Sequence, residues 1–146
     1  DLYPRLDIWR VALNSIFMKP LFGWGAASFP FIYSAFKNIN ENYVVYHSHN
    51  LFFELSINYG LIVSLIIFFN IMIILITSFR IIFYGKFIKK VKSYKAWFIA
   101  SLIALFTQTF DVTYYDIRIS LLFWILFTGL KSINEECLSQ PYIESK

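Results

Sequence analysis

The sequence predicts an all-α fold, namely a fragment of a polytopic membrane protein in which an outward-facing loop region with amphipathic helices precedes about three transmembrane helices. Hydrophobic residues make up 58% of the 146 residues and charged residues only 15%, against roughly 25% charged residues in an ordinary soluble domain. Residues 61–79 carry no charged side chain over 19 positions, which is enough helix to cross the ~30 Å hydrocarbon core of a bilayer. Six of the 13 basic residues lie within 80–95, with no acidic residue among them.

Residues 1–60 are expected to form the outward-facing region. The spacing of Ile8, Val11, Ala12 and Ser15 predicts a helix over 7–18, which Pro20 ends. Such a helix would lie along the membrane interface or pack on other helices. The sequence Gly23-Trp24-Gly25 predicts a tight turn, after which the aromatic residues 29–36 and the polar residues 37–43 lead to two histidines. The chain opens with Asp and has no signal-peptide pattern, so we expect it to be the C-terminal portion of a longer protein.

The remaining residues are predicted to form three spans, at about 61–79, 96–112 and 117–133. Short basic loops next to spans stay in the cytoplasm, which places residues 80–95 inside. Residues 1–60 and 111–118 then face outward, and the tail 134–146 is cytoplasmic. The second and third apolar runs, 96–110 and 119–130, are 15 and 12 residues long, so both need neighbouring residues to complete a span.

The charge pattern and the cysteine content exclude other classes. The net charge of +4 comes mostly from the loop between two spans, and no nucleic-acid-binding module is present, so nucleic acid is not an expected partner. The single Cys137 excludes an intrachain disulfide. The expected partner surface is the lipid bilayer.

The candidate chemistry lies just ahead of the uncharged run. His47, His49 and Asn50 form the densest group of polar side chains able to handle a proton, and histidine is the commonest general base for a hydroxyl. Arg5 and Arg10 lie on the same side of the membrane, and a guanidinium binds phosphate oxygens. We expect His49 as the base and Arg5 as the phosphate clamp, with Arg10, Asn50 and His47 contacting substrate.

Other interpretations of these residues stay open. The histidines could cap a helix, and Arg10 could contact lipid headgroups. The His-x-His pair could bind zinc, with Glu54 and Asp111 as further ligands, although no metal and no cofactor are expected. The chain could instead be a transporter module, but the predicted spans offer only Asn70 and Gln108 as polar mid-span side chains. A non-catalytic assembly protein is the third possibility.

Three sequence blocks resemble the O-antigen ligase and O-antigen polymerase family of bacterial membrane glycosyltransferases. The first is Arg5 followed four residues later by Trp9. The second is Pro20-Leu21-Phe22-Gly23-Trp24-Gly25. The third is His49-Asn50 followed after nine residues by Gly60-Leu61.

The resemblance implies an inner-membrane enzyme of about a dozen helices that acts in lipopolysaccharide or other surface-polysaccharide synthesis. Such enzymes transfer a glycan from undecaprenyl pyrophosphate to a sugar hydroxyl on a glycan or lipid-core acceptor, without a metal. His49 matches the motif histidine, and Arg5 matches the arginine ahead of the tryptophan. The family's N-terminal helices are not matched here, so these helices of the same protein are expected partners and the isolated fragment is expected to be inactive.

Overall fold

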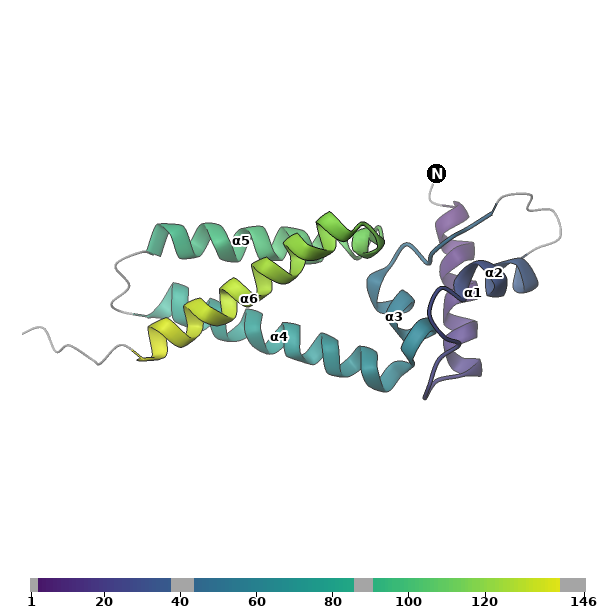
Figure 1. Cartoon of the computed structure of the whole chain (residues 1–146), viewed down its shortest axis with the longest axis horizontal. Coiled ribbons are helices and arrows are strands. Elements are labelled where there is room, and N and C mark those ends of the chain that lie inside the picture. The colour runs from purple at the N-terminus through teal and green to yellow at the C-terminus, as the bar shows by residue number, and fades with distance from the viewer. Residues whose placement is uncertain (1–2, 38–43, 86–90, 140–146) are drawn as a thin grey trace, which may run out of the picture.

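The computed structural model describes residues 3–37, 44–85 and 91–139. Within these ranges the chain is helical and contains no β-strand, which confirms the all-α prediction. The helices from residue 61 onward lie side by side, and those before it sit at one end of them (Figure 1). In chain order the elements are α1 (Tyr3–Met18), α2 (Phe29–Phe36), α3 (Leu51–Tyr59), α4 (Leu61–Tyr84), α5 (Val91–Thr107), the short 3-10 helix η1 (Thr113–Tyr115) and α6 (Ile117–Ser139).

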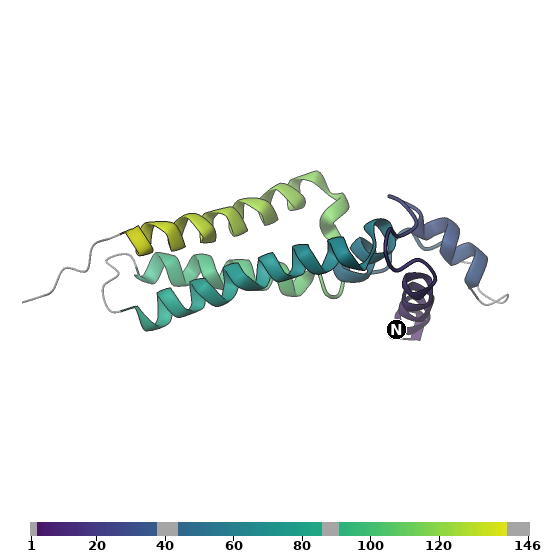
Figure 2. The same ribbon diagram turned by 90° about the horizontal axis from the view of Figure 1, so that it is seen from below.

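Helix α1 confirms the helix predicted over 7–18 and begins earlier, at Tyr3. All four residues of the predicted strip are buried. Val11 is 6% exposed and Ile8 is 4% exposed, while Ala12 and Ser15 are fully buried. This strip packs against Phe29 and other apolar residues of α2. The aromatic segment 29–36 therefore contributes to the same core, and it is itself the helix α2. Figure 2 shows α1 nearly end-on while the long helices run across the view, so α1 lies crosswise to the bundle.

The sequence places the histidines just ahead of the uncharged run, and in the structure a separate helix, α3, lies between them and the helix that begins at Leu61. α3 ends at Tyr59, where the Gly60 N–H donates to the Ser56 carbonyl at 2.9 Å. Gly60 has φ +87°, a backbone conformation that glycine adopts readily and that stops the helix. α4 then begins in a new direction, with the Leu61 N–H bonded to the Pro20 carbonyl at 2.7 Å.

The predicted turn at Gly23-Trp24-Gly25 docks on this junction. The Trp24 N–H donates to the Ile57 carbonyl at 2.7 Å, and the Gly25 N–H donates to the Asn58 carbonyl at 3.1 Å. Both glycines have positive φ, 67° at Gly23 and 101° at Gly25, as a tight turn of this kind requires. These bonds satisfy carbonyls at the end of α3 that have no partner within the helix.

Helices α4, α5 and α6 pack around a second apolar core that includes Leu75, Phe98 and Phe127. Their other faces are exposed and still apolar, for example Ile66 and Phe69 on α4. By length and composition, α4 and α6 are the two candidate membrane spans among the described residues. The structure therefore supports two of the three predicted spans.

The structure changes several predicted boundaries. α5 has 17 residues and ends at Thr107, five residues before the predicted end of the second span, and its first turns carry Lys92 and Lys95. α6 continues to Ser139, so the first residues of the predicted tail are helical. Residues 38–43, much of the basic loop (86–90) and the end of the tail (140–146) lie outside the described residues.

We predict that Gly60→Ala destabilises the fold more than Gly25→Ala does. A Cβ at Gly60 would overlap the Leu21 carbonyl, whereas a Cβ at Gly25 meets no atom within 4 Å. Both changes carry the backbone cost of an L-residue at positive φ, ~1–2 kcal/mol. The overlap at Gly60 adds on the order of 1–3 kcal/mol. Thermal unfolding in detergent measures the difference, and equal losses for the two variants would contradict this account of the junction.

Candidate functional site

The site forms where residues 44–50 cross the end of the bundle and meet the turn between α5 and α6 (Figure 1). Two hydrogen bonds join these segments. The Leu51 N–H donates to the Gln108 carbonyl at 2.9 Å, and the Asn50 side-chain amide donates to the Thr109 carbonyl at 3.1 Å. Because both bonds are accepted by backbone carbonyls of the turn, they fix the position of the histidine segment relative to the end of α5.

Asn50 is the N-cap of α3, so neither histidine caps this helix. Its backbone is extended, and its side-chain Oδ1 accepts the Phe53 N–H at 3.1 Å, as a capping asparagine does. Asn50 thus has one bond to its own helix and one to Thr109. Its predicted role in substrate binding stays a prediction, and it depends on the hydrogen-bonding capacity that these two contacts leave.

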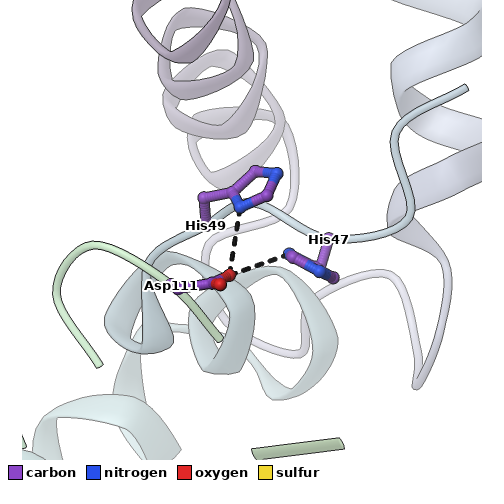
Figure 3. Close-up of side chains that lie close together, drawn as sticks. All are labelled: His47, His49 and Asp111. Carbon is purple, nitrogen blue, oxygen red and sulfur yellow. Dashed lines mark hydrogen bonds and ion pairs between the residues drawn. The ribbon is translucent and has the colours of Figure 1, made fainter. Parts of the chain in front are cut away.

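His49 occupies the left-handed region with φ +52°, which is uncommon for a residue with a side chain. This conformation turns the imidazole toward Asp111, whose Oδ1 lies 3.1 Å from His49 Nδ1 (Figure 3). The same oxygen accepts the Val112 N–H at 2.8 Å. A carboxylate only accepts hydrogen bonds, so the proton of a neutral His49 sits on Nδ1 and leaves the lone pair on Nε2.

His47 approaches the same carboxylate from the other side. Its Nδ1 lies 4.0 Å from Asp111 Oδ1, and its ring centroid lies 4.3 Å from that of His49. This nitrogen is buried and has no hydrogen-bond partner among the described residues. Burial, and secondarily the neighbouring His49, lowers the pKa of His47 below the usual histidine value, while Asp111 and Glu54 act in the opposite direction. His47 is therefore predominantly neutral at neutral pH.

A buried carboxylate holds the histidine segment in place. Glu54 is 1% exposed, and its Oε2 accepts the backbone N–H of Ser48, the residue between the two histidines, at 2.9 Å. Its Oε1 accepts the Tyr115 hydroxyl at 2.5 Å, and the Asn58 amide lies 3.4 Å away. Burial and this hydrogen bond raise the pKa of Tyr115, so the phenol keeps its proton and remains a donor.

Sequence reasoning missed the roles of Glu54 and Tyr115 and considered Asp111 only as a possible metal ligand. For Glu54 a signal was available, because it is a single acid within the otherwise apolar run Leu51-Phe52-Phe53-Glu54-Leu55, and a buried acid needs hydrogen-bond partners. Asp111 stands 62 residues from His49, so only the fold reveals their contact.

The two arginines lie on α1. Arg5 is half-buried and Arg10 is exposed. Between them Trp9 contacts Phe53 of α3, edge to face, with ring centroids 6.2 Å apart. Within the described ranges no hydrogen bond or ion pair links either arginine to the histidines. The predicted grouping of Arg5 with His49 therefore stays a prediction.

An apolar cavity of about 230 Å³ begins beside the start of α3. It follows α4 and α6 along the bundle, away from the histidines, and its polar lining is limited to a few groups such as Gln108 and Ser120. The apolar part of the lining comprises residues of α3, α4 and α6, among them Leu51, Leu55, Val63, Ile67 and Phe123. Its dimensions suit part of a flexible hydrocarbon chain.

Two kinds of chemistry fit the polar cluster. His49 paired with Asp111 has the arrangement of a general base and its orienting carboxylate. One ring nitrogen of each histidine and a carboxylate oxygen of Asp111 also all lie within 4.8 Å of one another, as potential ligands of a metal ion. Glu54, considered as a further ligand from the sequence, instead points to Ser48 and Tyr115.

Comparisons with curated proteins and with solved structures give no match. Residues 2–69 match the family model described as O-antigen ligase. The match contains Arg5, His49 and Asn50, and it ends before Asp111. It confirms the resemblance predicted from the three sequence blocks. The family comprises membrane-associated enzymes of the glycosyltransferase or ligase type, and residues 2–69 of this chain are similar to it.

Proposed function

We propose that this chain is part of a membrane glycosyltransferase that moves a glycan from undecaprenyl pyrophosphate to the hydroxyl of an acceptor sugar. The family match supplies the class of enzyme. The observation that carries the mechanism is the 3.1 Å contact between His49 and Asp111, because it orients a base at the end of an apolar bundle.

In the proposed reaction, His49 Nε2 accepts the proton of the acceptor hydroxyl as that oxygen attacks the anomeric carbon of the donor sugar. The bond from that carbon to the pyrophosphate oxygen breaks, and the electron pair leaves with the pyrophosphate. Asp111 accepts the hydrogen bond from Nδ1–H and stabilises the imidazolium that forms. A positioned base of this kind contributes about 10²–10⁴-fold in rate.

Arg5 is proposed to bind the pyrophosphate and offset the charge that develops as it leaves. The packing of Trp9 on Phe53 supports this assignment, because it fixes the first half of α1 against the helix that follows the histidines. Arg10, His47 and Asn50 are proposed to contact the sugar or phosphate groups, and no metal takes part in this reaction.

The polyprenyl chain of the donor is proposed to occupy the apolar cavity between α3, α4 and α6. The cavity begins near Leu51, which supports this placement of the polyprenyl chain. Leu51 follows Asn50 directly, and its N–H donates to the Gln108 carbonyl in the turn that precedes Asp111. A lipid held there would have its pyrophosphate end toward the histidines and its tail along the bundle.

Further helices of the same protein complete the site, and the isolated chain is inactive.

The proposed cellular location is the bacterial inner membrane, with the histidine end of the helix bundle on the outer side of that membrane. Arg80, Lys92 and Lys95 lie at the opposite end of the long helices, where basic residues mark the cytoplasmic side. In this arrangement α5 is the third span, and its lysines reach the interface with their long side chains. The crosswise direction of α1 then places it along the outer surface.

We predict that His49→Ala abolishes glycan transfer by the full-length protein, while His47→Ala keeps much of it. His49 Nδ1 lies within hydrogen-bond distance of Asp111 at 3.1 Å, whereas His47 Nδ1 lies 4.0 Å from it. Transfer from a purified lipid-linked donor, measured at matched expression and membrane insertion, tests this directly. Near-normal transfer by the His49→Ala protein would refute the base assignment.

Glycan profiles of cells carrying the same variants separate the rival functions. An enzyme variant loses a polymer or its attachment to the acceptor, whereas a transporter variant loses movement of a substrate and leaves the transfer reaction of the extracted protein intact. Normal profiles for a strain without the gene would favour a role in assembly.

We predict that Arg5→Lys fails to restore transfer, while Arg10→Lys is tolerated. An ammonium cannot reproduce the two-pronged contact of a guanidinium with phosphate oxygens, and losing such a contact costs on the order of 10²-fold in rate. Rates of the two variants under saturating acceptor provide the comparison. Equal tolerance at both positions would indicate a general electrostatic role, and sensitivity at Arg10 alone would mean that the clamp is Arg10.

We predict opposite membrane accessibility for cysteines placed at the two ends of the bundle. In a Cys137→Ala background, a cysteine at Tyr46, which is 72% exposed, should react with an impermeant thiol reagent in spheroplasts. A cysteine at Lys92, which is also exposed, should react only after the inner membrane is opened. The reverse pattern would contradict the orientation and the reaction proposed on the outer face.

A further inference from the structure

We propose that His47, His49 and Asp111 form a binding site for a transition-metal dication such as Zn²⁺, and that occupancy of this site stops transfer. The binding itself stands on the geometry of the three side chains. The inhibitory effect rests on the proposed function, because it requires His49 to be the base.

The distances are close to those of a zinc site. Zinc bound by imidazole nitrogens and a carboxylate oxygen at 2.0–2.2 Å in tetrahedral geometry holds its ligand atoms ~3.3 Å apart. Here Asp111 Oδ1 lies 3.1 Å from His49 Nδ1 and 4.0 Å from His47 Nδ1, and all three ligand atoms lie within 4.8 Å of one another. Movements of about an ångström, within the reach of side-chain rotation, would close them around an ion.

A second observation points to a ligand at this position. His47 Nδ1 is buried, has no hydrogen-bond partner among the described residues, and faces the carboxylate of Asp111 (Figure 3). A buried nitrogen without a partner is costly. A metal ion between the two rings would satisfy it and would also bind the acceptor oxygen of Asp111.

The surroundings fix the ligands in the way that metal sites require. Glu54 holds the backbone N–H of Ser48, between the two histidines, and the Val112 N–H holds the Asp111 carboxylate. Two imidazoles and one carboxylate favour Zn²⁺, Cu²⁺ or Ni²⁺ over Mg²⁺, which prefers oxygen ligands. Three protein ligands also leave one coordination position for water.

Metal binding would block the base through the tautomer of His49. When Nδ1 donates its lone pair to the metal, the single proton of the neutral imidazole must sit on Nε2. Nε2 then cannot accept a proton from the acceptor hydroxyl. The metal also removes Asp111 as the hydrogen-bond acceptor that stabilises the imidazolium, so both parts of the proposed catalytic pair are lost at once.

The test uses the full-length protein in detergent and measures metal binding and transfer separately. Co²⁺ added to the protein should give the visible absorption of a low-coordinate site, and Zn²⁺ should displace it. His47→Ala should weaken Zn²⁺ binding by at least ~10-fold, the lower end of the loss seen when even an outer-shell partner is removed. The zinc concentration for half-inhibition should rise by the same factor, with each variant compared with its own rate in chelator.

Asp116→Asn is the matched control, because Asp116 lies near the same turn but pairs with Arg118 at 2.9 Å. It should leave zinc binding and zinc inhibition unchanged. Zinc binding that is absent, or that is equal in wild type and His47→Ala, overturns the metal site and leaves the proposed reaction intact. Zinc binding that depends on His47 but does not slow transfer overturns the inhibitory role and the base role of His49 together.

Discussion

The site depends on the buried carboxylate of Glu54. This one side chain accepts hydrogen bonds from Ser48, in the segment that carries both histidines, and from Tyr115, in the turn that follows Asp111. Tyr115 lies 61 residues from Glu54 in the chain, so this bond brings distant segments together at a single helix turn. A hydrogen bond within a protein contributes about 0.5–1.5 kcal/mol, and leaving a buried polar group without its partner costs about 1–3 kcal/mol. The position of His49 relative to Asp111 follows from this anchoring.

The second constraint is the junction at Gly60, which separates the site from the apolar helix α4. Without the break, α3 and α4 would form one continuous helix, and the histidine segment would lie in line with the axis of that helix. The positive φ of Gly60 and its close approach to Leu21 instead redirect the chain. The turn at 20–25 is bonded to both helices through Leu61, Ile57 and Asn58. The N-terminal helices and the apolar bundle are therefore joined by backbone hydrogen bonds as well as by packing.

Sequence reasoning succeeded where structure is local and failed where distant segments decide it. The helix over 7–18, its buried strip and the turn at Gly23 follow from periodicity and glycine chemistry. The break at Gly60 was missed, and the close approach of the Leu21 carbonyl to Gly60 joins segments that lie far apart in the sequence. His49 was found from its motif, but its partner Asp111 was not. The predicted role of Arg5 stays a prediction, because no hydrogen bond or ion pair among the described residues links it to the histidines.

The protonation pattern of His49 tests the central claim most directly. We expect ¹⁵N NMR of the full-length protein in bilayers, assigned by comparison with His49→Gln, to show a neutral ring with the proton on Nδ1 and an unprotonated Nε2. Asp111→Ala should shift the population toward the Nε2–H tautomer, because the acceptor for Nδ1–H is lost. A His49 ring that carries its proton on Nε2 in the wild-type protein, and that does not respond to Asp111→Ala, would contradict the account.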